Sequence, residues 1–539
     1  MSAYKPMGPL DSPILQDGDR GFRGINSYLE PTSLEAGTVE VSENMRLEGD
    51  LASVRKGVQF KAGNVTFTYS GADQVFASTL FSDPATGTEF IALATKDKVI
   101  LWKDQNDTGI DIAYPVGEVV ASGDNASFVQ AMEKLILFRG ESKTPLEWDG
   151  DYTTPTAFVV KQNASPTAGR VQCPNTSFGV FFANRLIVPQ PSDSKYTVIM
   201  SDILETDNFY PAESQFRINR GSADSGIIAL TPYLENQLIV FFENSISLIN
   251  NCAVTSASAV FEITRQRGCV ARKSVAASGP QYYFLSHDGV YTLQQGLDPS
   301  KGLGVAISKV SGEAIPLSQP IQDQFADVNY ASADKAVGIV FDNKYFLAAP
   351  TGSSTTNNKC FVYDILQSSW TSVDSFPAGF QIDEFVTVLH GSSPQKRRLF
   401  AVSDKGWHLV EEGVVDVTGT IGSASTTTTA IPGRLKTRSY TFGNIDVKSW
   451  KGGQLGTNVK SGDEFTIKVN TIDPDNSSNV VHTENYSGSD EEKLIRFGSG
   501  RVRGYGASVE VNVQSGSPSF RHVSLQAIEG GANNRRNIA

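Results

Sequence analysis

The sequence predicts an all-β protein built around a β-propeller of about six to eight blades. Seven apolar segments, each long enough for two strands, recur between residues 89 and 412. β-Branched and aromatic residues are enriched in these segments, which favours strands over helices. Their starts lie roughly 45 to 60 residues apart, close to the length of a four-stranded blade.

Each segment begins with a polar residue, continues with aliphatic or aromatic residues, turns, and ends in a second apolar strand. Near-continuous apolar runs are typical of strands that are buried on both faces. Gly289 and Gly406 follow Asp and Lys in two of the turns, where we expect a positive φ. The segments span residues 89–103, 134–149, 184–201, 236–250, 281–294, 343–373 and 396–411.

The two ends of the chain lack this repeat. Residues 1–60, punctuated by glycine and proline, predict an extended N-terminal arm. Residues 61–412 form the predicted propeller, with an insertion near 296–327. Alternating strands in 413–539 predict a small β-sandwich-like domain with a loose tail, entered through a Thr/Ser-rich linker at 419–429. A pair of β-sandwiches is the alternative fold, since it also gives short strands with regular turns.

Composition limits the classes of function. Lys and Arg number 46 and Asp and Glu 58, so the net charge is −12 and the chain lacks the basic excess of a general nucleic-acid binder. No apolar run of about 18 residues occurs and the N-terminus has no apolar signal core, which predicts a protein made in the cytoplasm without a membrane span. We expect the four scattered cysteines to be buried free thiols.

Motifs for catalysis, metal binding or cofactor binding are not recognisable, so we expect no enzyme, no metal and no cofactor. The five histidines follow no ligand spacing, and neither a nucleophile elbow nor a phosphate-binding loop occurs. Four of the five tryptophans close the second strand of a repeat, which favours packing between blades over a sugar platform. Carboxylates from distant strands could still converge on one propeller face, so a carbohydrate-binding or carbohydrate-hydrolysing propeller is the alternative function. A scaffold propeller that binds peptides is a further alternative.

Motifs at both ends resemble one protein family. The arm contains Gly24-Ile25-Asn26, followed by Leu34, Gly37, Asn44, and Gly57 after Arg55-Lys56. The C-terminal part contains the segments 433–443, 448–451 and 501–530. In this order they resemble the tail nozzle or hub proteins of short-tailed bacteriophages, also called packaged-DNA stabilisation or tail tubular proteins.

The resemblance implies a structural protein of the phage tail in the virion. Such proteins form a ring, usually a homo-hexamer, that holds packaged double-stranded DNA and becomes the conduit for its ejection. The partners implied are adaptor (head–tail connector) proteins and tail fibre, spike or needle proteins. The arm would dock to neighbouring subunits, so removal of residues 1–57 should impair assembly more than propeller folding. The expected subunit or adaptor contacts are Phe22, Arg23, Tyr28, Arg434, Lys436, Arg438, Arg501 and Arg503. The alternative for each is an ordinary solvated residue with no partner, which fits the sequence equally well.

Overall fold

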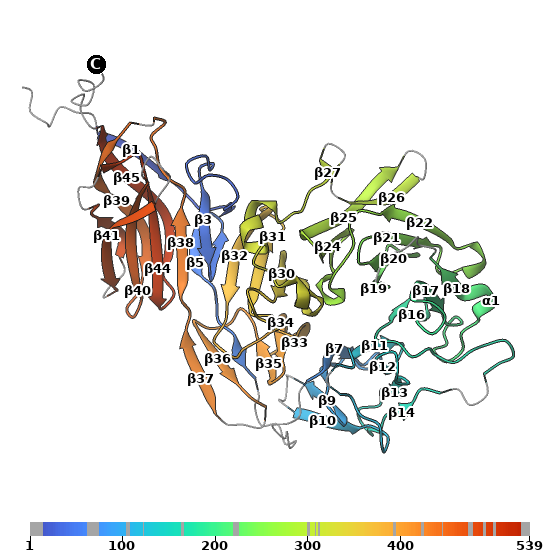
Figure 1. Cartoon of the computed structure of the whole chain (residues 1–539). Coiled ribbons are helices and arrows are strands. Elements are labelled where there is room, and N and C mark those ends of the chain that lie inside the picture. Colours follow the sequence, from blue (N-terminus) through green and yellow to red (C-terminus); the bar gives the residue numbers. More distant parts are fainter. Residues whose placement is uncertain are drawn as a thin grey trace, which may run out of the picture.

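A β-propeller and a β-sandwich lie beside each other in the computed structural model of the chain (Figure 1). The structure describes residues 14–529 except 62–74, 104–107, 122, 163–165, 219–225, 299–301, 308, 311–312, 392–394, 422–424, 445, 473–477, 489–491 and 500–502. The expected Arg501 and the tail at 530–539 therefore lie outside the described residues.

Five blades are antiparallel sheets of four consecutive strands. The first contains β7 (Ala77–Ser82), β8 (Glu89–Ala94), β9 (Lys98–Lys103) and β10 (Thr108–Ala113). The second contains β11 (Ser127–Ala131), β12 (Lys134–Phe138), β13 (Leu146–Trp148) and β14 (Val159–Val160). The third contains β15 (Val180–Phe182), β16 (Arg185–Pro189), β17 (Thr197–Met200) and β18 (Gln215–Arg217). The fourth contains β19 (Ile227–Tyr233), β20 (Gln237–Phe242), β21 (Ile246–Asn250) and β22 (Ala259–Thr264), and the fifth β23 (Ala276–Ser278), β24 (Gln281–Ser286), β25 (Gly289–Asp298) and β26 (Gly302–Ile307).

A sixth blade of consecutive strands precedes a seventh sheet that the N-terminal arm completes. The sixth contains β29 (Val337–Phe341), β30 (Lys344–Ala349), β31 (Lys359–Asp364) and β32 (Ser369–Ser375). The seventh contains β33 (Glu384–His390), β34 (Lys396–Ser403) and β35 (Gly406–Leu409), and its fourth strand is β6 (Gln59–Phe60). Because β33 contacts β7 of the first blade, the ring closes between the two ends of the repeat.

Helices and a small hairpin occupy the connections. The predicted insertion near 296–327 begins within β25 and β26 of the fifth blade, and its remainder contains β27 (Lys309–Val310), β28 (Glu313–Ala314), η3 (Gln319–Ile321) and α2 (Gln322–Phe325). The helix η4 (Tyr330–Lys335) follows it. The other short helices are α1 (Pro211–Ser214), η1 (Thr255–Ala257) and η2 (Arg272–Ser274). None of the helices in the described part of the chain has the length and apolar character needed to cross a bilayer.

Apolar strands and large aromatic side chains fill the space between blades, as the sequence predicts. Trp102 of β9 and Trp407 of β35 are fully buried, with ring centroids 4.8 Å apart, and so pack the first blade against the seventh. Gly289 and Gly406 have φ values of 138° and 133°, which confirms the positive φ expected in these two turns.

The sandwich is built from both ends of the chain. One sheet has the order β3 (Thr38–Glu43), β38 (Gly433–Thr437), β44 (Gly506–Ser515), β40 (Glu464–Ile472) and β41 (Ser478–Ser487), with β2 (Gly24–Ile25) beside β3. The other has the order β4 (Met45–Glu48), β5 (Leu51–Val54), β45 (Ser519–Glu529), β39 (Lys448–Val459) and β42 (Glu492–Phe497), with β1 (Ile14–Asp19) on β45 and β43 (Arg503–Gly504) on β39. Their apolar faces share one core, in which the ring centroids of Phe465 and Phe520 are 5.4 Å apart.

Two domain boundaries differ from those expected. The arm is extended, but its strands pair within the sandwich, so the C-terminal domain is not separate from residues 1–60 (Figure 1). The expected linker at 419–429 is partly sheet, because β36 (Val415–Gly419) and β37 (Thr426–Ala430) extend the seventh blade beyond β6. The first difference comes from pairing between segments several hundred residues apart, which a local pattern does not reveal, whereas the second is a local hairpin in a Thr/Ser-rich segment that lacks an apolar pattern.

Candidate functional site

Three expected contact residues on β38 or just after it bind the chain's own arm. Arg434, Lys436 and Arg438 alternate along one face of the strand, where every second side chain points the same way. Each forms an ion pair with an acidic residue of the arm. The pairs are Arg434 Nη1–Glu43 Oε1 at 3.7 Å, Lys436 Nζ–Glu40 Oε1 at 2.7 Å, and Arg438 Nε–Asp19 Oδ1 at 3.0 Å.

Buried polar contacts reinforce the last of these pairs. Asp19 is buried, and its carboxylate also accepts hydrogen bonds from Tyr440 Oη at 2.8 Å and from the Gly37 amide at 3.0 Å. Burial and the neighbouring Asp19 carboxylate together raise the pKa of Tyr440 well above its ordinary value. Lys436 and Arg438 therefore hold the arm in place, whereas the partly exposed Arg434 also donates through Nε to Glu510 of β44 at 3.0 Å, closer than its contact with Glu43.

The other expected contact residues divide into buried and exposed ones. Phe22 is 1% exposed and belongs to the sandwich core, so it cannot contact another subunit. The Arg23 side chain is 76% exposed and lies 3.5 Å from Asp50, and Tyr28 is 58% exposed. Arg503 is exposed on β43. Arg23, Tyr28 and Arg503 are therefore available at the surface.

Arg23 lines a groove of about 470 Å³ between the arm and the sixth blade. We call it the arm groove, defined by Arg23, Asn26, Leu317, Pro320 and Trp370. Trp370 Nε1 donates to the Leu317 carbonyl at 2.9 Å and so fixes one wall. The Tyr28 amide donates to the Pro320 carbonyl at 3.2 Å, which places the exposed tyrosine next to the groove.

Sequence reasoning missed a buried ionic network where the arm, the propeller and the sandwich meet. Arg46 of β4 binds Asp374 of β32 through two hydrogen bonds of 3.0 and 2.7 Å, and its Nε donates to Glu411 at 3.0 Å. Arg55 binds Asp416 of β36 through two hydrogen bonds of 2.9 and 2.7 Å. Both guanidinium groups are buried, so they need these carboxylates as partners.

Asn44 and Gly57, two residues of the arm motif, hold this network together. The Asn44 side chain accepts from Arg55 Nε at 3.0 Å and donates to the Pro432 carbonyl at 2.8 Å. A Cβ on Gly57 would lie 1.9 Å from the carbonyl oxygen of Val415, so only glycine fits against β36. The arm motif marks Asn44, Arg55 and Gly57 as a group, but no local signal shows that Arg55 is buried and needs a carboxylate partner.

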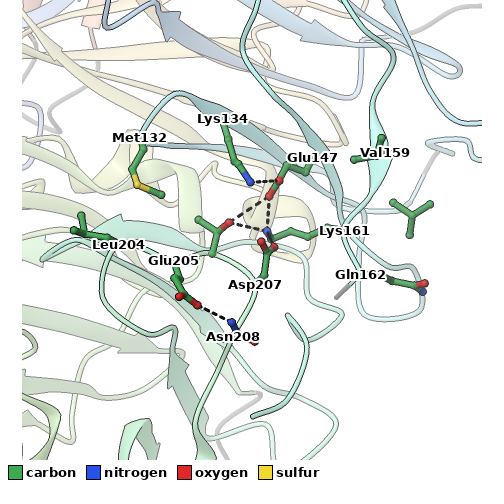
Figure 2. A pocket seen from close by; sticks show the side chains of 12 residues that line it. Met132, Lys134, Glu147, Val159, Lys161, Gln162, Leu204, Glu205, Asp207 and Asn208 are labelled. Atoms are coloured by element: carbon green, nitrogen blue, oxygen red, sulfur yellow. Dashed lines mark hydrogen bonds and ion pairs between the residues drawn. The ribbon is translucent and has the colours of Figure 1, made fainter. Parts of the chain in front are cut away.

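A second candidate site is a cavity of about 500 Å³ between the second and third blades (Figure 2). Lys161, whose side chain is 1% exposed, forms an ion pair with Glu147 and donates to Thr206 Oγ1 at 2.9 Å and to Asp207 Oδ1 at 2.5 Å. Lys134 of β12 donates to the other oxygen of Glu147 at 2.6 Å. The Glu147 carboxylate is therefore bound on both oxygens by lysines, an arrangement unlike the proton-exchanging carboxylate pair of a glycosidase.

The positions of His287, His408 and the four cysteines are consistent with structural roles for these residues. His287 lies in a turn, 3.3 Å from Glu243, and His408 is fully buried between Phe60 and Phe380. All four cysteines are buried free thiols, and burial raises the pKa of Cys269 to about 12. In the part of the chain that the structure describes, no three His, Cys, Asp or Glu side chains gather as they would around a metal ion.

Comparisons with known proteins define similarity of fold only. No family model and no curated protein matches the sequence. Similar structures include the extracellular domain of a putative one-component system from B. thetaiotaomicron (11% identity, 90% of this chain and 62% of that chain, TM-score 0.39) and PorZ, a surface component of the type-IX secretion system of Porphyromonas gingivalis (10%, 80% and 46%, 0.33). Another is YCF48 from Cyanidioschyzon merolae (9%, 64% and 97%, 0.36). The chain spans about 62% of the first of these, and likeness at this level carries no argument about function.

Proposed function

We propose that this chain is a structural protein of the bacteriophage tail, a subunit of the ring-shaped nozzle or hub. One observation carries the proposal: Gly24, Asn44, Arg55 and Gly57, which give the arm its family resemblance, are also residues that fix it in place. Asn44, Arg55 and Gly57 act at the buried network, and a Cβ on Gly24 would meet Ser369 of β32 at 2.7 Å. The motif residues thus have structural roles in this chain, and this supports the proposal.

In this role the ring, a homo-hexamer, retains packaged DNA and then becomes the conduit for its ejection. A chain with net charge −12 would bind the phosphate backbone weakly, so DNA would slide past its wall. The partners proposed are adaptor proteins above the ring and tail fibre, spike or needle proteins beside or below it. The protein would reside in the virion after synthesis in the host cytoplasm.

Arg23 and Tyr28 beside the arm groove are the proposed contacts between subunits. In a cyclic ring each subunit uses two different surfaces, and a groove on one subunit has to receive a projection from the next. The arm groove offers two prolines, Pro316 and Pro320, and the exposed guanidinium of Arg23 to such a projection. Aromatic and arginine side chains are enriched at protein interfaces, which supports this choice.

Mass photometry and electron microscopy of the purified protein and of phage particles test the proposal. We expect rings of cyclic symmetry, in isolation or docked to particles. The double variant Arg23→Ser/Tyr28→Ser should lower ring incorporation without lowering the melting temperature, whereas Val116→Ser, at an exposed propeller residue, should change neither. A chain that is monomeric and never found in phage particles would contradict the proposed function.

The effect of removing residues 1–57 on propeller folding stays a prediction, but the removal would also disrupt the sandwich. Those residues supply β3, β4 and β5 to the sandwich and Arg55 to the buried network. Their loss would expose the core of the sandwich itself, so point variants at exposed arm residues replace the deletion as the test.

A further inference from the structure

Apolar side chains stand exposed around the cavity of Figure 2. Met132, in the turn between β11 and β12, is 37% exposed, and Leu204, in the loop between β17 and α1, is 60% exposed. Both have a positive φ, 57° and 59°, which is unfavourable for a bulky side chain. Val159 of β14 is 59% exposed and also lines the cavity. Gathered around one cavity, these three side chains offer exposed apolar surface that a partner protein would bury.

The charged groups of the cavity do not balance. Three carboxylates, Glu147, Glu205 and Asp207, face two ammonium groups, those of Lys134 and Lys161. Both oxygens of Glu147 are occupied by lysines. By contrast, Asp207 accepts from Lys161 through Oδ1, and Glu205 accepts from Asn208 through Oε2 at 2.6 Å. Among the described residues, no donor bonds to Asp207 Oδ2 or Glu205 Oε1. Both oxygens are therefore open to a donor from another molecule.

We propose that this cavity binds an arginine or lysine side chain, flanked by apolar side chains, from an extended segment of another polypeptide. A cationic group would neutralise the excess negative charge and donate to the open oxygens of Asp207 and Glu205. The apolar stem and its neighbours would cover Met132, Val159 and Leu204. None of the twelve lining residues is aromatic, so the cavity lacks the stacking platform that a sugar ring prefers. This inference does not depend on the proposed function.

Ligand-observed NMR titration with two peptides tests the proposal. The probes are acetyl-Gly-Leu-Arg-Leu-Gly-amide and the same peptide with citrulline, which keeps the shape of arginine but carries no charge. We expect saturable binding of the arginine peptide, at least about tenfold tighter than the citrulline peptide, because a charge-assisted hydrogen bond is lost. Added salt should weaken only the arginine peptide.

Variants locate the binding site. Asp207→Asn keeps an oxygen for Lys161 but removes the charge, and Leu204→Asn suits the positive φ while removing the apolar surface. Each should weaken the arginine peptide at least fivefold, and Asp342→Asn, in an exposed turn of the sixth blade, should leave it unchanged. Equal binding of the two peptides, no saturable binding, or binding that none of the cavity variants alters would overturn the proposal. Saturable binding of maltohexaose that Asp207→Asn abolishes would overturn it in favour of a carbohydrate site.

Discussion

Arg55 and Asp416 form a buried ion pair that joins the arm to β36, the strand that extends the seventh blade beyond β6. Both side chains are 2% exposed, and both nitrogens of the guanidinium fork engage the carboxylate. Such a pair is costly to bury but more costly to break, because the remaining charge has no partner. Nothing in the local sequence distinguishes Arg55 from the exposed Arg23, since only the fold decides which one is covered.

Replacing Asp416 with Ala should therefore destabilise the protein strongly. The unpaired guanidinium of Arg55 predicts a loss of about 3–5 kcal/mol in the free energy of unfolding, measured by urea denaturation. Asp193→Ala, which breaks a pair with the largely exposed Arg217, should give a much smaller loss. Similar losses for the two variants would contradict the structural role assigned to the buried pair.

His408 should make the protein sensitive to acid. Its ring lies in the apolar space between Phe60 and Phe380, and burial lowers its pKa from 6.5 to about 3. Between these two values the unfolded chain binds the proton and the folded chain does not, so the free energy of unfolding should fall as the pH is lowered from about 6.5 to about 3. Above pH 6.5 this contribution is constant.

Comparison with His408→Leu isolates this effect in urea denaturation at several pH values. The variant should show a shallower decline on acidification than the parent protein. Burial raises the pKa of Asp383 to about 6, which gives the opposite slope between about pH 3.8 and 6 and is present in both proteins. Parallel pH profiles would show that His408 ionises in the folded state.

At the scale of elements, strand length decides what the sequence reveals. The long apolar strands, such as β20 and β30, are buried over nearly their whole length and were predicted from composition. Strand β6 has two residues, too few for a periodic signal, yet it closes the propeller by pairing with β35 and β36. Its position is fixed instead by Gly57, which lets the chain pass close to Val415.

Gly57→Ala should therefore weaken the closure of the seventh blade. The added Cβ would overlap the carbonyl of Val415, so the strand has to move, at a cost of about 1–3 kcal/mol. Hydrogen exchange should become faster in β6, β35 and β36, while β19 to β22 of the fourth blade stay protected. Gly506→Ala is the matched control, because its Cβ would meet its nearest atom at an ordinary 3.5 Å. Unchanged exchange in the seventh blade would show that β6 does not depend on this glycine.

At the scale of the whole molecule, the arm couples the propeller to the sandwich. Its strands belong to both sheets of the sandwich, β6 belongs to the propeller, and Arg46 and Arg55 cross between them. The two bodies should consequently unfold together, giving a single transition in scanning calorimetry. Asp374→Ala removes a partner of Arg46 and so weakens the link between the two bodies. In this variant, the single unfolding transition should separate into two. Two transitions in the parent protein would show that the arm does not couple the bodies.

The sequence by itself determined the class of fold, the strong hairpins and the packing role of the tryptophans, because these depend on residues near one another in the chain. It also marked the arm as distinct, because the arm contains glycines such as Gly57, where any larger residue would clash with a neighbouring strand. Only the tertiary structure decided that the arm pairs with the C-terminal strands and that Arg438 and Lys436 bind Asp19 and Glu40. The physical reason is distance along the chain: partners hundreds of residues apart leave no local period, and burial, which turns a surface charge into a structural one, exists only after folding.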